Sequence, residues 1–168
     1  MISRLVVIAG SGDYPRLVLE GAKRAGVPVA DVIAIKGSTD RATVRAADHV
    51  NWITLGTVAK GIRETAARGY DGAVLAGQIN PLSLFRGGFE AEVRQWLSEL
   101  KVKCAHTIFS KLIEKLTEHG IRTLPASVFM DGHVPGVGAL TVRGLSDAER
   151  DDVARGVQVA RDVGAHDV

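Results

Sequence analysis

The sequence predicts an α/β protein with an open parallel sheet and helices on both of its faces. Apolar runs typical of buried strands alternate with amphipathic stretches along the chain, which is the pattern of a parallel sheet built from βα units. The first run, residues 4–9, leads into a glycine turn and then into a helix that begins with a proline. The chain has 168 residues, an ordinary size for one core, so we expect a single domain over residues 1–168.

The strands are predicted from apolar, β-branched runs that lie between turn-forming residues. They are expected at residues 4–9, 31–36, 48–53, 72–76 and 121–125. Residues 37–47 are expected to be a polar connection, and residues 79–88 and 131–137 are expected to be loops rich in proline and glycine. Trp52 and Trp96 are expected to be core residues, because indole rings fill α/β cores well.

The helices are predicted from the spacing of apolar residues and from their end signals. They are expected at residues 15–25, 57–68, 89–100, 107–119 and 146–163. Gly26, Gly69 and Gly120 follow three of these helices and are typical residues for a helix end. Ser146 is a good N-cap for the last helix, and Glu149 three residues later completes a capping box.

The composition is that of a globular protein in the cytoplasm. Hydrophobic residues make up 46% of the chain and charged residues 24%, and no apolar stretch approaches the roughly 20 residues that span a bilayer. The first ten residues lack the cleavage site of a signal peptide, and the single Cys104 cannot form an internal disulfide. The net charge is only +2 and the basic residues are scattered, so nucleic acid is not an expected partner.

Glycines and polar residues follow the first and the fourth predicted strand. In open α/β sheets ligands gather outside the carboxyl ends of the strands, and a helix N-terminus after a glycine turn favours phosphate. A tight turn without a ligand is the simpler alternative for each. We expect the two turns to share one binding crevice, lined by Gly10, Ser11, Gly12 and Asp13 on one side and by Gly77, Gln78 and Asn80 on the other.

Other features that suggest catalysis or metal binding are interpreted as structural. The histidines at positions 49, 106, 119, 133 and 166 are scattered, without the spacing of metal ligands. Ser110 and Lys111 lack the rest of a serine–lysine motif, and Cys104 and His106 do not share a helix face. Four acids at positions 147, 149, 151 and 152 suit the first turns of a solvated helix. We therefore predict no catalytic residue and no metal ligand.

Several short motifs along the chain resemble those of a known family. They are Ile8-Ala9-Gly10-x-Gly12-x-Tyr14-Pro15, Val50-x-Trp52-x-x-Leu55-Gly56 and Ala76-Gly77-Gln78, followed by Leu140-Thr141 and a run from Gly156 to Asp167. In this order they resemble the N-terminal domain of the LpxI-type UDP-2,3-diacylglucosamine diphosphatases. The resemblance implies a Rossmann-like domain and a C-terminal catalytic domain that is absent from this chain. The chain departs from the family pattern at residues 101–116, where a more acidic helix start is usual.

The resemblance also implies an activity and a set of binding residues. The family hydrolyses the pyrophosphate of UDP-2,3-diacylglucosamine with Mg²⁺ or Mn²⁺, giving UMP and a lipid sugar phosphate for lipid A assembly. The catalytic acid belongs to the C-terminal domain, so we expect this chain to bind the UDP-sugar, to hold no metal by itself and to be inactive alone. Substrate binding is assigned by position to Gly10, Ser11, Gly12, Gly77, Gln78 and Asn80, with Thr141 as a further candidate.

The implied partners are the UDP-linked glycolipid and the missing C-terminal domain. Contact with the inner membrane through the lipid substrate and a homodimer are left open. Two alternatives also remain: an oxidoreductase domain that uses nicotinamide or flavin, and a nucleotide-binding module without catalysis. The nicotinamide alternative is disfavoured because Pro15 stands at the third glycine position of that motif and no clear ribose-binding acid follows about twenty residues later.

Overall fold

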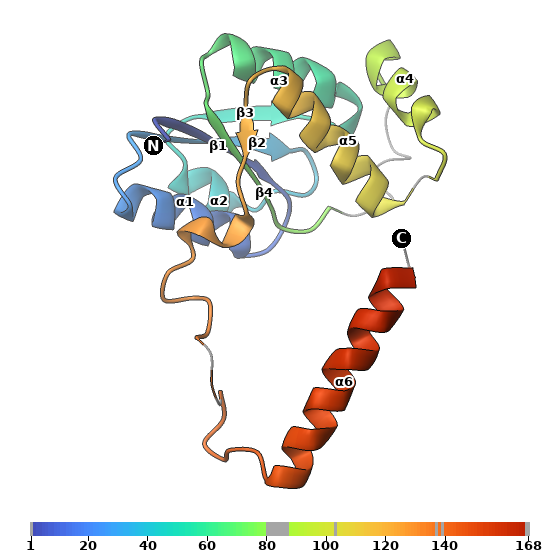
Figure 1. Cartoon of the computed structure of the whole chain (residues 1–168). Helices are drawn as coiled ribbons and strands as arrows, with labels where there is room; N and C mark the ends of the chain where they lie inside the picture. Colours follow the sequence, from blue (N-terminus) through green and yellow to red (C-terminus); the bar gives the residue numbers. More distant parts are fainter. Residues whose placement is uncertain (1, 80–87, 103, 137, 139, 167–168) are drawn as a thin grey trace. The chain divides into compact units, whose positions relative to one another are not determined.

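The computed structural model describes residues 2–79, 88–102, 104–136, 138 and 140–166. The chain forms two compact units, Met1–His133 and Val134–Val168, and each is described by itself. The described part of the first unit contains five parallel strands, β1 (Arg4–Ala9), β2 (Val29–Ile35), β3 (Val50–Ile53), β4 (Gly72–Ala76) and β5 (Arg122–Thr123), in the order β3-β2-β1-β4-β5 (Figure 1).

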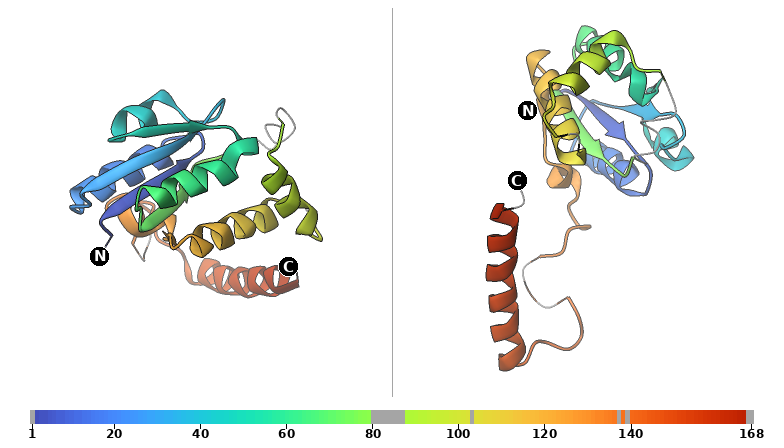
Figure 2. Two further views of the ribbon diagram at one scale, coloured as in Figure 1. Left: turned by 90° about the horizontal axis from the view of Figure 1, so that it is seen from above. Right: turned by 90° about the vertical axis from the view of Figure 1, so that its right-hand side faces the viewer.

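Helices cover both faces of this sheet (Figure 2). One face carries α1 (Tyr14–Arg24), α2 (Arg41–Ala46) and the short 3₁₀ helix η3 (Ala126–Phe129). The other face carries the 3₁₀ helix η1 (Leu55–Thr57), α3 (Val58–Ala67), α4 (Ala91–Glu99) and α5 (Ala105–Glu118). The predicted α/β class, an open parallel sheet with helices on both faces, is confirmed.

The two faces have separate apolar cores, and successive residues of β1 alternate between them. Val6 and Ile8 pack with residues of α3, α4 and α5, whereas Leu5, Val7 and Ala9 pack with α1. All five side chains are at most 4% exposed. Side chains of an extended strand point alternately to opposite faces, so a strand that is apolar at every position must be covered on both faces.

The connection between β2 and β3 differs from the sequence prediction. The sequence predicts only a polar connection there, but the structure contains α2. Its side chains Val44 and Ala46 pack against the core on the α1 face. A helix of six residues is too short to show a clear helical period, which is why the pattern does not reveal it.

The two tryptophans have different environments. Trp96 is 9% exposed in the core beneath α4, which confirms the prediction for that residue. Trp52 is 46% exposed, so its predicted place in the core is wrong. It lies on β3, an edge strand of the sheet, where part of its side chain stays in solvent. Most other elements differ from prediction by one or two residues at an end. The larger differences are that β5 has only two residues and that the last helix continues past Gly164.

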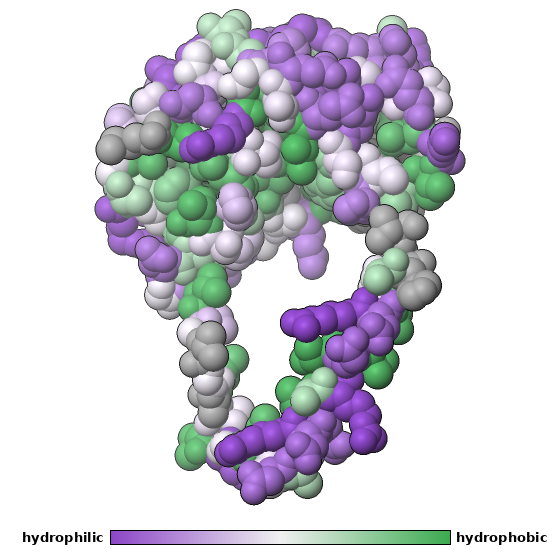
Figure 3. Space-filling model, viewed as in Figure 1, coloured by the Kyte–Doolittle hydropathy of each residue, from purple (hydrophilic) through white to green (hydrophobic). Residues whose placement is uncertain are grey.

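The second unit consists mainly of α6 (Asp147–His166), and its start has the predicted capping box. The Ser146 amide donates to Glu149 Oε2 at 2.8 Å, and the Glu149 amide donates to Ser146 Oγ at 3.4 Å. Hydrogen bonds from Arg143 and Ser146 lower the pKa of Glu149 to about 2. Valines 153, 157 and 163 are exposed on this helix. Figure 3 shows hydrophobic residues among hydrophilic ones along it. Of the helices in the described part of the chain, none is long and apolar enough to cross a membrane.

The carboxylate of Asp71 joins the beginnings of β1 and β4. Its Oδ1 accepts a hydrogen bond from the Arg4 amide at 2.9 Å, and its Oδ2 accepts bonds from the Ser3 amide at 3.0 Å and the Ser3 hydroxyl at 2.9 Å. Burial raises the pKa of this carboxyl, but the bonds from Arg4 and Ser3 outweigh burial and leave the pKa below its ordinary value. The ionised form of Asp71 therefore stabilises the fold.

We expect Asp71→Asn to lower the free energy of unfolding by about 1–2 kcal/mol at pH 7, the usual range for hydrogen bonds to a charged group. Because the folded pKa is lowered, the loss should be complete above the unfolded pKa, about 3.9, and should shrink as the pH falls below it. Urea unfolding between pH 7 and pH 3 measures this. Asp131→Asn, at an exposed site of the same unit, is the control and should change little. A loss independent of pH would contradict the assignment.

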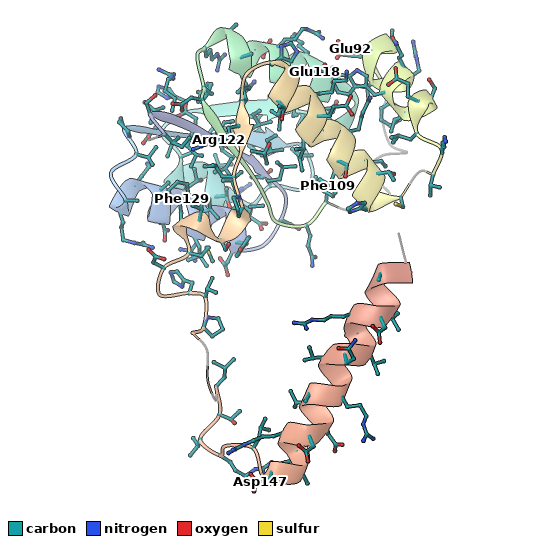
Figure 4. The ribbon with its side chains drawn as sticks, viewed as in Figure 1. Glu92, Phe109, Glu118, Arg122, Phe129 and Asp147 are labelled. Carbon is teal, nitrogen blue, oxygen red and sulfur yellow. The ribbon has the colours of Figure 1, made fainter. Side chains whose placement is uncertain are left out.

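The segment after β5 returns to α1 and packs against a glycine of that helix. A Cβ at Gly21 would lie 1.8 Å from the backbone oxygen of Phe129, which lies on η3 beside α1 (Figure 4). Met130, the next residue, is 3% exposed in the core of that face. Gly21 thus allows η3 to close the core.

We expect Gly21→Ala to destabilise the protein by about 2–3 kcal/mol, because the added methyl group must displace the backbone of η3. Gly61→Ala in α3 is the matched control. There the new Cβ would lie 3.3 Å from a methyl group of Ile53, and the better helix propensity of alanine offsets the contact, so the change should stay within about 1 kcal/mol. Denaturant unfolding compares the two. Equal stability of both variants would refute the packing argument.

Candidate functional site

The turns that follow β1 and β4 are joined through their backbones. The Gly10 amide donates to the carbonyl of Ala76 at 2.8 Å. Beyond it, Ser11 and Gln78 form an antiparallel bridge, with one N–H···O bond of 2.8 Å and the reverse bond of 3.0 Å. The Ser11 hydroxyl also donates to the Gln78 carbonyl at 3.1 Å. The two turns therefore form one continuous wall at the carboxyl edge of the sheet.

Two glycines of this wall are required by the contact between the turns. A Cβ at Gly10 would lie 2.2 Å from the backbone oxygen of Gln78. Gly77 has a φ of +85°, and a Cβ there would lie 2.6 Å from the backbone oxygen of Ser11. The sequence interpretation assigned these glycines to close approach of a ligand. In the structure, the group that approaches them is the neighbouring turn.

Gly12 differs from these two glycines. Its φ is +92°, but a Cβ there would have no heavy atom within 4 Å. Its amide donates to Oδ2 of Asp40 at 2.6 Å. Asp40 comes from the turn after β2, so a third strand end reaches the same place.

Thr39 holds that third turn against β1. Its hydroxyl donates to the carbonyl of Ala9, the last residue of β1, and accepts from the amide of Ile35 at 2.7 Å. The hydroxyl thus connects the ends of β1 and β2. The position of Asp40 follows from this attachment, because Asp40 is the next residue.

A cation near the start of α1 is shared between two carboxylates. Arg16 lies 3.3 Å from Asp13 and 2.8 Å from Glu20. Hydrogen bonds to Glu20 and then to Asp13 raise the pKa of the Arg16 guanidinium further. Arg16 is therefore engaged within its own helix, and the glycine turn beside it carries the carboxylates of Asp13 and Asp40.

A family model described as the LpxI N-terminal domain matches residues 4–133. This chain belongs to the LpxI family. The match ends at His133, where the first compact unit also ends. A search of curated proteins found no match. The recognition of an LpxI N-terminal domain from the short motifs is confirmed, and the motifs between Leu140 and Asp167 lie beyond the matched residues.

The structure brings most of the predicted LpxI site residues together. Gly10, Ser11, Gly12, Gly77 and Gln78 all lie in the joined turns. Substrate contact by these residues stays a prediction.

Of the remaining two predicted residues, one lies outside the described residues and the other belongs to the second unit, and one residue at the turns was missed from the sequence alone. Asn80 lies outside the described residues. Thr141 belongs to the second unit, where its hydroxyl donates to the Arg143 carbonyl at 2.7 Å. The missed residue is Asp40, whose only sequence signal is a short polar run, Ser38-Thr39-Asp40, after an apolar strand.

Residues weighed as alternatives in this LpxI chain have other roles. The ammonium group of Lys111 lies 2.9 Å from both Glu114 and Glu99, and these contacts raise its pKa. A lysine held protonated in this way cannot serve Ser110 as a base. Cys104, expected to be structural, is exposed at the N-cap of α5, where hydrogen bonds with Thr107 lower its pKa. Among the described residues there is no group of three or more metal-ligating side chains.

A second polar cluster lies at the opposite, amino edge of the sheet. Asp31 is 3% exposed and accepts hydrogen bonds from the Tyr70 hydroxyl and, at 3.0 Å, from the His49 amide. Burial and then the Asp31 carboxylate raise the pKa of Tyr70. The Arg4 guanidinium stacks 4.9 Å from the centre of the Tyr70 ring. The cluster satisfies a buried carboxylate and holds the strand beginnings together.

We expect Gly77→Ala to be clearly more destabilising than Gly12→Ala. Both residues have positive φ, so both variants should lose about 1–2 kcal/mol to the left-handed backbone. Only the Gly77 variant meets backbone atoms of the other turn, which should add about 1–3 kcal/mol. Chemical denaturation measures the difference. Equal losses would show that the contact between the turns contributes little to stability.

Proposed function

We propose that this chain is the substrate-binding domain of a UDP-2,3-diacylglucosamine hydrolase of lipid A biosynthesis. The observation that carries the proposal is the family match over residues 4–133, which spans the whole wall formed by the joined turns. The wall lies at the carboxyl ends of parallel strands, the edge at which open α/β sheets bind nucleotides. The proposed ligand is the UDP-sugar part of the glycolipid.

Gln78 is the residue that we assign to direct contact with this ligand. Its backbone is fixed by the bridge to Ser11, whereas its side chain is exposed at the wall. An amide side chain offers both donors and acceptors, which suits a uracil edge or a sugar. The Ser11 hydroxyl already donates to the Gln78 carbonyl, but its oxygen can still accept a hydrogen bond.

The residues at the wall do not fit the divalent cation that the family reaction uses. Hydrolysis of a pyrophosphate needs carboxylates that hold such a cation against the phosphoryl oxygens. Here Asp13 is paired with Arg16, and Asp40 is bound by the Gly12 amide. We derive no catalytic step through a metal on this chain. In our proposal the reacting acid and the Mg²⁺ or Mn²⁺ belong to a second domain, without which the chain is inactive.

The remaining partners follow from the same proposal. The acyl chains of the glycolipid would bring the protein to the inner membrane surface from the cytoplasm. The contact would be peripheral, through the lipid substrate. An oxidoreductase domain with nicotinamide and a nucleotide-binding module without catalysis are the competing functions that an experiment must separate.

We expect UMP and UDP to bind the whole chain weakly, at the joined turns. In ¹H–¹⁵N spectra the largest shifts should fall on the amides of residues 10–12 and 77–78, with no comparable response to NAD. Gln78→Ala should weaken UMP binding about fivefold, the effect of one neutral hydrogen bond. Gln95→Ala, on the exposed side of α4, is the matched control and should leave binding unchanged. Preferential binding of NAD would favour the oxidoreductase alternative.

A turnover assay tests separately whether the chain alone is inactive. The pure chain should release no UMP from UDP-2,3-diacylglucosamine with Mg²⁺ or Mn²⁺, because the two acids at the joined turns, Asp13 and Asp40, already have partners within the protein. Steady UMP release by the pure chain would disprove that part of the proposal, even where the binding part holds.

A further inference from the structure

Asp40 uses its carboxylate in an unusual way for a helix N-cap. It precedes α2 at the N-cap position, where an aspartate normally accepts a hydrogen bond from the first turn of its own helix. No such bond forms here, and Oδ2 instead accepts from the Gly12 amide at 2.6 Å. The side chain therefore serves the glycine turn after β1.

This arrangement fills the place where a phosphate would otherwise bind. In phosphate-binding glycine turns, the backbone amides face the anion. Here the Gly12 amide already has an anionic partner that is part of the protein. Asp13 adds a second carboxylate to the turn, and the cation of Arg16 is shared between Asp13 and Glu20. A phosphate at this turn could not accept a hydrogen bond from the Gly12 amide, and the negative charges of Asp40 and Asp13 would repel it.

The same carboxylate is well placed to bind hydroxyl groups. An ionised carboxylate accepts hydrogen bonds at both oxygens. Within the described part of the chain, Oδ1 of Asp40 has no hydrogen-bond partner, and Asp40 is exposed. In dinucleotide-binding α/β folds, an acid beyond the second strand binds ribose hydroxyls, typically about twenty residues after the glycine turn. Asp40 follows at a longer spacing, which is why the sequence motif does not reveal it. The Thr39 hydroxyl, hydrogen-bonded to the Ala9 carbonyl and the Ile35 amide, holds the next residue, Asp40, beyond the end of β2 and beside the glycine turn.

We propose that Asp40 makes the glycine turn after β1 a site for sugar hydroxyl groups and excludes phosphate from it. This inference rests on the proposed function, since it assigns the ligand's orientation in the same crevice. The ribose or the hexosamine of a UDP-sugar lies against Asp40, and the diphosphate lies away from Gly12. Asp40 is thus a specificity-determining residue for the ligand.

The first test uses inorganic phosphate and does not need a UDP ligand. Phosphate is titrated into ¹⁵N-labelled whole chain, and the Gly12 amide shift is followed. The wild type should show no saturable shift, whereas Asp40→Ala, which frees the amide, should show one with at least about tenfold tighter apparent binding. Asp13→Asn removes a charge from the same turn but leaves Asp40 on the Gly12 amide, so it should gain clearly less phosphate affinity than Asp40→Ala. Saturable phosphate binding at Gly12 of the wild type would overturn the proposal.

The second test uses ligands that differ only in hydroxyl groups. The wild type should bind 2′,3′-dideoxy-UMP about tenfold more weakly than UMP if the ribose is the group bound, and Asp40→Ala should bind both within about twofold. If the hexosamine is the group bound, Asp40→Ala should instead remove an advantage of UDP-N-acetylglucosamine over UDP. A variant that alters neither comparison would refute hydroxyl binding by Asp40. If no uridine ligand binds any variant, the proposed function fails, and the phosphate titration still decides whether Asp40 excludes phosphate.

Thermal melting of each variant distinguishes an effect on ligand binding from a loss of folded protein. Asp40 is exposed and makes no cap bond to α2, so Asp40→Ala should stay folded and melt only slightly below the wild type, by the loss of its bond to the Gly12 amide. Asp40→Asn keeps the size and an acceptor for the Gly12 amide but removes the charge. It should therefore weaken hydroxyl binding without admitting phosphate as strongly as Asp40→Ala. Identical behaviour of the two variants toward phosphate would contradict the role of the occupied amide.

Discussion

The backbones of the turns after β1 and β4 touch, and the crevice depends on that contact. Two neighbouring parallel strands normally diverge beyond their ends, where helices begin. Here Gly10 and Gly77 remove the two side chains that would keep the turns apart, so Ser11 and Gln78 pair as an extra antiparallel bridge. The bridge extends the order of the sheet beyond its last residues. Polar side chains at this edge therefore come from backbone that is hydrogen-bonded between the two turns.

This contact also changes what the glycine turn can offer a ligand. The amides of Gly10 and Ser11 donate to the β4 turn, and the amide of Gly12 donates to Asp40. Amide donors are what a glycine turn uses to hold phosphate, so each internal bond removes one of them. The exposed groups that remain are the side-chain amide of Gln78 and a carboxylate oxygen of Asp40. These groups suit hydroxyls and a base edge better than an anion. The same turn sequence can thus serve a different ligand group, depending on which residues arrive from the neighbouring strands.

The sequence predicts the parts of this structure that depend on local pattern. β1 and β4 have the predicted bounds, because each is a continuous apolar run that ends at a glycine. The helices that end before Gly26, Gly69 and Gly120 are close to prediction for a similar reason. What the sequence does not predict depends on strand order. Asp40 meets Gly12 because β2 lies beside β1, and Trp52 is exposed on β3, which lies at an edge of the sheet. The order of the strands cannot be predicted from residue spacing. The sequence therefore predicts the position of the site but not the carboxylate of Asp40 that lies on the Gly12 amide.

The separation of binding from chemistry follows from how these carboxylates are used. Mg²⁺ is held by several oxygen ligands, whereas the two acids at this turn already have partners: Asp40 accepts from a backbone amide through one oxygen, and Asp13 is paired with Arg16. Both contacts stabilise the turn in its present shape, so recruiting either acid as a metal ligand would weaken the wall that binds the ligand. In the proposed orientation the sugar hydroxyls face this wall and the diphosphate faces away from it. The bond to be cleaved is then exposed to a second domain, which can supply the cation without disturbing the groups that recognise the substrate.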